Sequence, residues 1–397
     1  MQVPLVPTSS VASTPLNCNT MAADQGKAIN FNAGPAKIPE AVMEKAQREF
    51  INYARTGHSI LEMSHRSTDF DKVIKGCEQL LREEMSIPGD YDVLFMQGGA
   101  SGQFAAIPLN LAALSRNKVQ SCADYVVTGS WSEKACKEAE KYLNPVKVNS
   151  PKKPYVSVSD PASWTRDADA AYLYYCANET VHGIEICEVP ETLPGVPLVA
   201  DVSSNILSRP FDVSKHGIVY GGTQKNLGAA GLTITIVQKD LIGHEHKMTP
   251  SVFCYSEMSK NNSVYNTPSC YGIYITKLVL EWIKETGGVH ALFDRNQTKS
   301  TMIYDIINGS DGFYSCGVDP KYRSHMNVPF RVGGAAGNEV LEKEFLTGAV
   351  ARGMIGLKGH RSVGGIRASL YNAVTLEETG ALAEYMKEFM ADHHDKQ

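Results

Sequence analysis

Lys225 stands among small, uncharged residues, in the run Val219-Tyr220-Gly221-Gly222-Thr223-Gln224-Lys225-Asn226-Leu227-Gly228. Twenty-four residues upstream, Pro197-Leu198-Val199-Ala200-Asp201 has the pattern of a buried strand that ends in a carboxylate. A lysine amine for a Schiff base and a carboxylate for a pyridinium nitrogen are the two groups that pyridoxal phosphate requires. The pair therefore makes pyridoxal phosphate the first hypothesis. A surface lysine beside an ordinary helix-capping aspartate is the alternative.

A second candidate feature is a glycine-rich turn that can hold a phosphate. The segment Gly98-Gly99-Ala100-Ser101-Gly102-Gln103 follows a predicted strand and opens a helix. The first turn of a helix offers unpaired N–H groups and the positive end of the helix dipole, which suit a phosphate. The turn matches neither a Walker loop nor a GxGxxG fingerprint, so it does not indicate a nucleotide. A tight turn without a ligand is the alternative.

Basic residues stand beside glycine in two further segments. These are Ser64-His65-Arg66-Ser67 and Lys358-Gly359-His360-Arg361-Ser362-Val363-Gly364-Gly365-Ile366-Arg367. Arginine pairs bidentately with carboxylates and phosphates, and glycine lets a small ligand come close. The two segments therefore favour a substrate with several negative charges. For any one of these arginines alone, a surface or interdomain salt bridge is the alternative.

Two more side chains follow predicted strands. Trp131 comes after Thr128-Gly129-Ser130, and its indole can stack on an aromatic cofactor or belong to the core. Thr180, in Asn178-Glu179-Thr180, can offer a hydroxyl to a ligand or cap the next element. Neither residue alone decides between its two interpretations.

The elements that must position these residues alternate along the chain from about 90 to 240. Strand-like segments alternate with helical ones, which predicts an α/β fold with a mainly parallel sheet and helices on both faces. Ligands bind such sheets outside the carboxyl ends of the strands, where the candidate residues lie. The predicted strands are 92–96, 124–128, 170–175, 198–201, 217–221 and 232–238, and the predicted helices include one opened by Pro39, 103–115, 132–141 and 271–286.

Composition narrows the class of protein. The chain has 397 residues, of which 43% are hydrophobic and 20% charged, as is usual for a globular enzyme. A net charge of −5 does not suggest nucleic-acid binding through a basic surface. The nine cysteines show no Cys-x-x-Cys pair and no Cys/His ligand spacing. We therefore predict no metal site, no disulfide framework and a reducing, cytoplasmic setting.

The distribution of charged residues along the chain bears on targeting signals, membrane spans and domain boundaries. Residues 1–23 carry no charged side chain and no arginine, which is unlike a mitochondrial presequence. The longest uncharged stretch, 94–115, is interrupted by glycine, proline and asparagine, so no membrane span is predicted. We expect residues 1–28 to be a disordered extension, 29–290 a large cofactor-binding domain and 291–397 a small α+β domain, with 29–39 packing against the small domain.

Together these stretches resemble the phosphoserine aminotransferases, which are fold-type I pyridoxal phosphate enzymes of the class V aminotransferase group. The resemblance runs from about Asn30 to the end of the chain. Its motifs are Asn30-Phe31-Asn32-Ala33-Gly34-Pro35-Ala36, Glu62-Met63-Ser64-His65-Arg66, Gln103-Phe104-Ala105-Ala106-Ile107-Pro108-Leu109-Asn110, Asn178-Glu179-Thr180, Asp201-Val202-Ser203-Ser204-Asn205-Ile206-Leu207-Ser208-Arg209, Gly222-Thr223-Gln224-Lys225-Asn226, Tyr265-Asn266-Thr267-Pro268 and Gly359-His360-Arg361-Ser362-Val363-Gly364-Gly365-Ile366-Arg367-Ala368-Ser369.

The resemblance implies a role for each matching position around the cofactor. Lys225 would be the Schiff-base lysine, and Asp201 would pair with the pyridinium nitrogen. Trp131 would stack on the ring, and Thr180 would bond near its phenolic oxygen. The cofactor phosphate would be held by Ala100, Ser101 and Gln224, and by Asn266 and Thr267 of the neighbouring subunit, so a homodimer with shared active sites is implied.

The resemblance also implies the substrates. Arg367 would bind the α-carboxylate, and the distal phosphate or carboxylate would meet His360 and Arg361 together with His65 and Arg66 of the neighbour. The implied reaction is L-glutamate plus 3-phosphohydroxypyruvate giving 2-oxoglutarate plus O-phospho-L-serine. The implied fold has a seven-stranded, mainly parallel sheet. Some bacterial relatives carry arginine where this chain has Ser101. Phosphate recognition in this chain is therefore expected to depend more on His65, Arg66, His360 and Arg361.

Three other functions stay open on the sequence. A cysteine desulfurase needs a mobile cysteine late in the chain, and Cys316, the only cysteine beyond 270, lacks that context. A small-substrate aminotransferase of the alanine–glyoxylate kind would not need two His-Arg pairs. A non-catalytic binding protein of the same fold is disfavoured because Lys225, Asp201 and Arg367 occur together.

Overall fold

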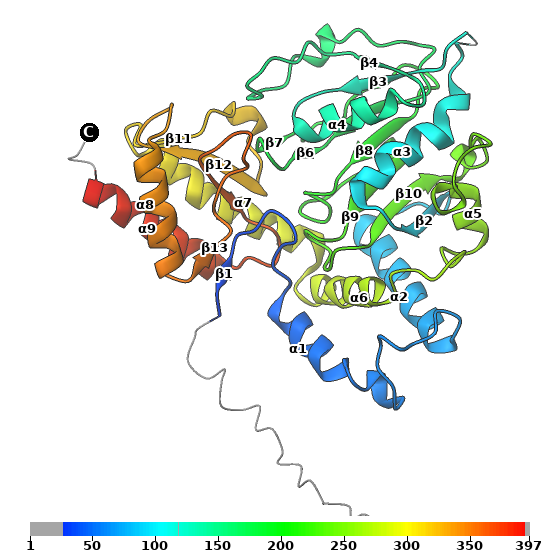
Figure 1. Ribbon diagram of the computed structural model, residues 1–397, viewed down its shortest axis with the longest axis horizontal. Coiled ribbons are helices and arrows are strands. Elements are labelled where there is room, and N and C mark those ends of the chain that lie inside the picture. The colour runs from blue at the N-terminus through cyan, green and yellow to red at the C-terminus, as the bar shows by residue number, and fades with distance from the viewer. Residues whose placement is uncertain (1–26, 118, 394–397) are drawn as a thin grey trace, which may run out of the picture.

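A seven-stranded sheet forms the centre of the computed structural model, which describes residues 27–117 and 119–393 (Figure 1). Its strand order is β2-β10-β9-β8-β5-β3-β4. Only β10 runs antiparallel to its neighbours, so the other six strands end at the same edge. The strands are β2 (Tyr91–Met96), β3 (Cys122–Val126), β4 (Asn144–Lys147), β5 (Leu173–Cys176), β8 (Leu198–Asp201), β9 (Ile218–Gly222) and β10 (Thr233–Gln238).

The predicted, mainly parallel seven-stranded sheet is confirmed, and all six strands expected from the pattern lie in it, with ends that shift by up to three residues. Strand β4 was missed. It is the edge strand beside β3, its residues are half-buried or exposed, and it contains Pro145. An edge strand needs no continuous apolar run and tolerates proline, so it lacks the signal of a buried strand.

Helices cover both faces of the sheet. On one face lies α3 (Gly99–Leu111), whose Gln103 donates to the Met96 sulfur of β2 at 3.4 Å, with α4 (Ser130–Ala139) packed beside it. On the other face, Ile74 of α2 (Thr68–Met85) shares a cavity lining with Val93 and Phe95. Helix α2 packs along α6 (Cys270–Glu285), which contacts α1 (Glu40–Glu49); the short α5 (Tyr255–Lys260) lies against β2.

The C-terminal part forms a smaller α+β unit, on the left of Figure 1. Its antiparallel sheet has the order β11-β12-β14, and its helices are α7, α8 and α9. Strand β1, near the start of the described chain, pairs in parallel with β13 of this unit. The bounds are β1 (Ile29–Asn30), β11 (Tyr314–Ser315), β12 (Asn327–Val332), β13 (Met354–Ile355), β14 (Ile366–Ser369), α7 (Gly288–Asn308), α8 (Glu339–Ala351) and α9 (Leu376–His393).

Two hydrophobic cores correspond to these two units, and helix α7 contributes to both. Val289 and Leu292 near its start belong to the core around the large sheet. Ile303 and Tyr304 belong to the second core, which also contains Phe31. The predicted boundary after residue 290 therefore falls inside one continuous helix and stays a prediction. The disorder expected for 1–28 concerns residues that lie, apart from the last two, outside the described ones.

None of the helices in residues 27–117 and 119–393 is long and apolar enough to cross a membrane.

Candidate active site

A cavity of about 240 Å³ lies at the carboxyl ends of the parallel strands. The turns after β2, β3 and β9 and the end of β8 contribute to it from the large sheet, and the segment around β14 contributes from the small unit. Eight of the predicted site residues line this one cavity: Ala100, Trp131, Thr180, Asp201, Gln224, Lys225, His360 and Arg367.

Lys225 enters this cavity from the turn that follows β9. Its side chain is only 9% exposed, and its Nζ donates to Thr180 Oγ1 at 2.8 Å. Burial lowers the pKa of the Lys225 amine, and the charge of Arg367 lowers it further, against an opposing effect of Asp201. An amine with a lowered pKa carries a lone pair more of the time at neutral pH, which suits a nucleophile and general base.

Gly34 gives Lys225 room on the other side. A Cβ at this position would lie 3.4 Å from Lys225 Cγ, and its backbone has φ +137°, which strains any other residue. The Ala36 N–H donates to Gln224 O at 2.9 Å, which ties this N-terminal segment to the lysine turn.

Asp201 is the last residue of β8 and is 3% exposed. Its Oδ1 accepts from the Ser203 N–H at 2.8 Å, and its Oδ2 accepts from the Tyr220 hydroxyl at 3.0 Å. Hydrogen bonds of this kind stabilise the charged form of a carboxylate. The cavity thus contains a fixed negative charge close to the lysine amine.

Trp131 lies in the first turn of α4, and a buried carboxylate fixes that turn. Glu179 ends β6 (Asn178–Glu179), which pairs with β7 (Ile184–Glu185). Its Oε2 accepts from the Trp131 N–H at 2.9 Å, and its Oε1 accepts from the Ser132 N–H at 2.8 Å and the Ser132 hydroxyl at 2.6 Å. A carboxylate at a helix N-terminus satisfies unpaired N–H groups and the dipole. The indole is thereby held against the cavity, with its ring centroid 5.8 Å from Lys225 Nζ.

Arg367 and His360 face the cavity from the small unit. Arg367 Nη1 donates to Thr180 O at 3.3 Å, and burial lowers the pKa of its guanidinium. Burial and the charge of Arg367 lower the pKa of His360, whose Nδ1 lies 2.7 Å from Ser362 Oγ. Both side chains therefore offer hydrogen-bonding groups to a ligand opposite the sheet.

Three buried polar atoms of residues that line this cavity have no hydrogen-bond partner within the described residues. They are Trp131 Nε1, Asn178 Oδ1 and Arg367 Nε. Leaving such atoms unpaired costs free energy, about 1–3 kcal/mol each, so they indicate a place for a polar ligand. With a lysine amine, a carboxylate, an indole and the N-terminus of α3, this donor set fits pyridoxal phosphate and an anionic substrate.

Comparison with known proteins agrees with this geometry. The family model described as aminotransferase class V matches residues 28–382. The chain belongs to the class V aminotransferase family. It is 58% identical over 369 residues to a probable phosphoserine aminotransferase of Caenorhabditis elegans, covering 93% of this chain and 98% of the relative. It is 54% identical over 361 residues to the phosphoserine aminotransferase of Drosophila melanogaster, covering 91% and 98%.

A solved structure agrees as well. The pyridoxal-phosphate-bound phosphoserine aminotransferase of Trichomonas vaginalis has a TM-score of 0.86 and 36% identity, covering 91% of this chain and 100% of that one. The predicted family, the predicted transaminase class and the fold type are confirmed.

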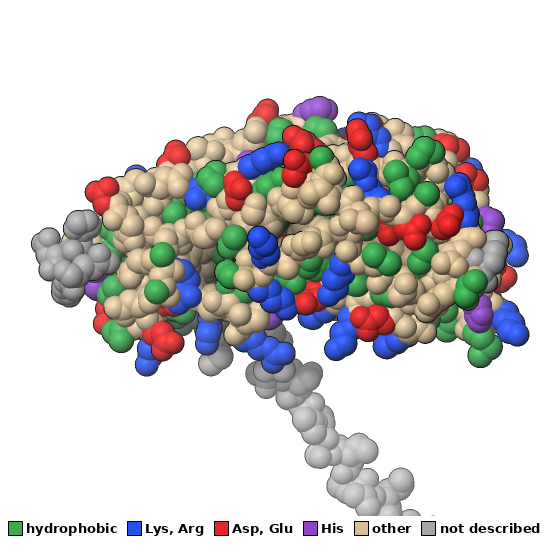
Figure 2. Space-filling view, turned by 90° about the horizontal axis from the view of Figure 1, so that it is seen from above, with side chains coloured by type: hydrophobic (Ala, Val, Ile, Leu, Met, Phe, Trp, Pro, Cys, Tyr) green, Lys and Arg blue, Asp and Glu red, His purple; other side chains and the backbone are tan. Residues whose placement is uncertain are grey.

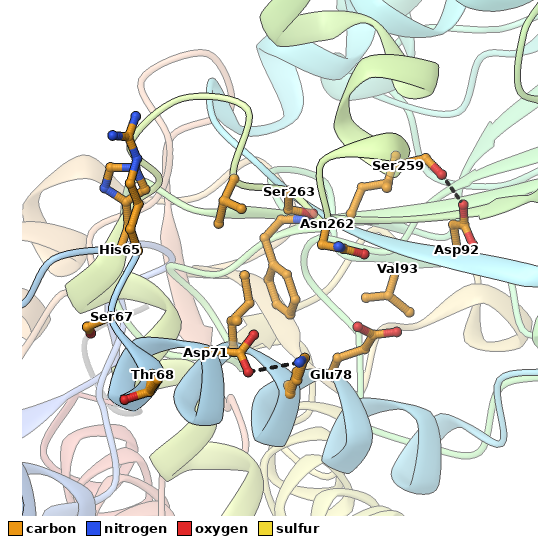
Figure 3. A pocket seen from close by; sticks show the side chains of 16 residues that line it. His65, Ser67, Thr68, Asp71, Glu78, Asp92, Val93, Ser259, Asn262 and Ser263 are labelled. Carbon is orange, nitrogen blue, oxygen red and sulfur yellow. Dashed lines mark hydrogen bonds and ion pairs between the residues drawn. The ribbon is translucent and has the colours of Figure 1, made fainter.

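Six predicted site residues of this class V aminotransferase lie outside the cavity. Ser101 and Arg361 are exposed, one residue beyond Ala100 and His360 respectively. Asn266 and Thr267 are exposed in the segment between α5 and α6. His65 and Arg66 belong to the segment just before α2, and they line a different cavity of about 520 Å³ (Figure 3). One chain alone does not bring these six residues to Lys225, so their roles stay predictions.

Several residues that build the site of this class V aminotransferase have no role among those expected from the sequence. Glu179 stands inside a quoted motif, but its partners are N–H groups 47 and 48 residues away. Tyr220 stands in the run around Lys225, and only strand pairing shows that it faces Asp201. Gly34 also belongs to a quoted motif. Its backbone has a positive φ, which the presence of a glycine at this position could have suggested from the sequence.

Proposed function

We propose that this chain catalyses the reversible transfer of the amino group of L-glutamate to 3-phosphohydroxypyruvate, giving 2-oxoglutarate and O-phospho-L-serine, in L-serine biosynthesis. The observation that carries the proposal is one cavity with Lys225, Asp201 and Arg367 on its wall. The relatives named phosphoserine aminotransferase support the choice of substrates.

Pyridoxal phosphate, when bound, supplies an electron sink for the charge that develops at the substrate α-carbon. In this proposal the Lys225 amine, with its lowered pKa, takes the α-proton and returns it as a general acid. Asp201 would provide the negative charge opposite the ring nitrogen, and Trp131 would stack on the ring. Arg367, which is half-buried, would bind the α-carboxylate through charge-assisted hydrogen bonds.

The remaining roles concern phosphate groups. The N-terminus of α3 at Ala100 and Ser101, together with Gln224, would hold the cofactor phosphate. His360 and Arg361 would receive the distal group of the substrate. A set of Arg and His donors can bind both a γ-carboxylate and a phosphate ester, which an apolar pocket cannot do. Figure 2 shows several Lys and Arg side chains along the lower edge of the molecule in that view, on a chain whose net charge is −5.

A homodimer completes the proposed site. Asn266 and Thr267 of the partner subunit would reach the cofactor phosphate, and His65 and Arg66 of the partner subunit would reach the substrate. Large apolar side chains are exposed near these residues in the single chain, including Leu61 at 56% and Tyr265 at 46%. Such exposure favours a protein interface.

We also propose a cytoplasmic location. The eight cysteines of the described residues are all free thiols, and five of them are buried. Free cysteines in this number suit a reducing compartment.

Absorbance tests the cofactor assignment first. The purified protein should absorb visible light, and borohydride or Lys225→Ala should abolish that band. A colourless protein that takes up no pyridoxal phosphate refutes the proposal.

A coupled assay tests the substrates. With glutamate as donor, 3-phosphohydroxypyruvate should be preferred over pyruvate and glyoxylate; the opposite order would favour a small-substrate aminotransferase. Arg367→Ala should weaken both substrates, whereas Arg66→Ala should weaken the phosphorylated one more. Equal losses in Arg66→Ala would contradict the division of roles.

A further inference from the structure

Behind Asp201 lies a chain of buried hydroxyl groups that crosses three neighbouring strands. The Tyr220 hydroxyl of β9 donates to Asp201 Oδ2 at 3.0 Å. The Tyr174 hydroxyl of β5 lies 2.8 Å from the Tyr220 hydroxyl. Strand register makes this possible, because Tyr220 pairs directly with Asp201, and β8 lies between β5 and β9. Both tyrosines are almost completely buried.

The direction of the protons in this chain is fixed. A carboxylate only accepts hydrogen bonds, so the Tyr220 proton points to Asp201. The Tyr220 oxygen is then the acceptor for Tyr174, whose proton points the same way. Burial, followed by the charge of Asp201, raises the pKa of both hydroxyls well above the usual value, so both remain donors. Hydrogen bonds in such a row polarise one another and strengthen the last one.

We propose that Tyr220, supported by Tyr174, is a positioning residue that holds the Asp201 carboxylate in place to face the ring nitrogen of the cofactor. This rests on the proposed function, in which Asp201 pairs with that nitrogen. Burial alone disfavours a charged carboxylate, and only the Ser203 N–H and the Tyr220 hydroxyl donate to this one among the described residues. Phenylalanine would fill nearly the same volume in the core, so packing alone does not explain the hydroxyl groups of Tyr174 and Tyr220.

Tyr175 provides a matched control. It stands next to Tyr174 in β5, is equally buried, and its hydroxyl also has a buried partner, His216 Nε2 at 2.8 Å. That bond has no connection to Asp201. Tyr175→Phe therefore removes a comparable hydrogen bond from the same strand and reports any general loss of stability.

The test uses the full-length chain freed of cofactor, titrated with pyridoxal phosphate and with its 1-deaza analogue, in which C–H replaces the ring nitrogen. Quenching of tryptophan fluorescence gives both dissociation constants. Tyr220→Phe should reduce the preference for pyridoxal phosphate by about tenfold to a hundredfold, the effect of one hydrogen bond to a charged group. Affinity for the analogue should change little, because it makes no use of the Asp201 charge.

The remaining variants complete the comparison. Tyr174→Phe should also reduce the preference for pyridoxal phosphate, but by a smaller factor. It leaves the direct bond from Tyr220 to Asp201 intact, so it still tests the inference if Tyr220→Phe fails to fold. Tyr175→Phe should retain the wild-type preference. A folded Tyr220→Phe or Tyr174→Phe with unchanged preference, or an equal loss in Tyr175→Phe, overturns the inference. A wild-type chain with no preference would instead refute the role of Asp201 in the proposed function, and the inference with it.

Discussion

Gly129→Ala should destabilise the protein severely, although the change adds one methyl group. Gly129 precedes α4 with φ −176° and ψ −165°, an extended conformation that alanine adopts without strain. A Cβ at this position would lie 2.5 Å from Glu179 Oε2 and 2.6 Å from Glu179 Cγ. The cost is therefore a collision with one buried carboxylate and not a backbone effect.

The magnitude follows from what Glu179 must give up. Its carboxylate is buried and accepts three hydrogen bonds, from the N–H groups of Trp131 and Ser132 and from the Ser132 hydroxyl. Bonds to a charged group contribute about 1.5–3 kcal/mol each, and displacement of the carboxylate breaks at least two of them. We expect Gly129→Ala to lower the free energy of unfolding by about 3–5 kcal/mol.

Urea unfolding of the full chain measures this, and a double-mutant cycle isolates the cause. Glu179→Ala removes the atoms that collide, so adding Gly129→Ala in that background should cost less than about 0.5 kcal/mol. Gly380→Ala is the control, because a Cβ at this position in α9 meets no atom within 4 Å. It should be neutral or stabilise by up to about 1 kcal/mol, as alanine does in helices. Additive costs for Gly129→Ala and Glu179→Ala would refute the collision.

Two further predictions concern stability. Burial lowers the pKa of His216 to about 4, so between pH 4 and 6.5 the unfolded chain binds a proton that the folded chain does not. The free energy of unfolding should therefore fall by up to about 3 kcal/mol as the pH drops through this window. His216→Gln should flatten that part of a curve of unfolding free energy against pH, and an unaltered slope would contradict the assignment to His216. Lys299→Met should cost about 3–5 kcal/mol in urea unfolding, because Nζ donates to three backbone carbonyls at 2.9 Å each. Lys284→Met, which removes an exposed ion pair, should have little effect on the free energy of unfolding. Similar costs for the two variants would show that the carbonyl contacts contribute little.

The parts of this site that the sequence could predict are those with local signals. Asp201 ends a run of apolar residues, and Lys225 stands in an unusually small and uncharged segment, so each is visible without knowing the fold. Alternation of strands and helices then places both at one edge of a sheet. For the same reason the glycine turn before α3 could be connected with a phosphate.

The parts that could not be predicted depend on which strands become neighbours. Tyr174 and Tyr220 meet only because β5, β8 and β9 are adjacent in the sheet, an order that crossover connections hide. Glu179 likewise reaches its helix across 47 residues. Strand β4 was missed because an exposed edge requires no apolar pattern. Local patterns thus indicate the groups that do chemistry, and strand order decides which groups support them.

Several contacts join the large and the small unit at the site, and the β6–β7 hairpin provides two of them. The Thr180 hydroxyl accepts from Lys225, whereas its carbonyl accepts from Arg367 of the small unit. Two residues earlier, Asn178 Nδ2 donates to Asn327 Oδ1 of β12 at 2.9 Å. The lysine that would react with the substrate and the arginine that would bind its carboxylate are therefore held by the same residue. Because Lys225 belongs to the large unit and Arg367 to the small one, a movement of the small unit that separates them would weaken the effect of Arg367 on the pKa of Lys225.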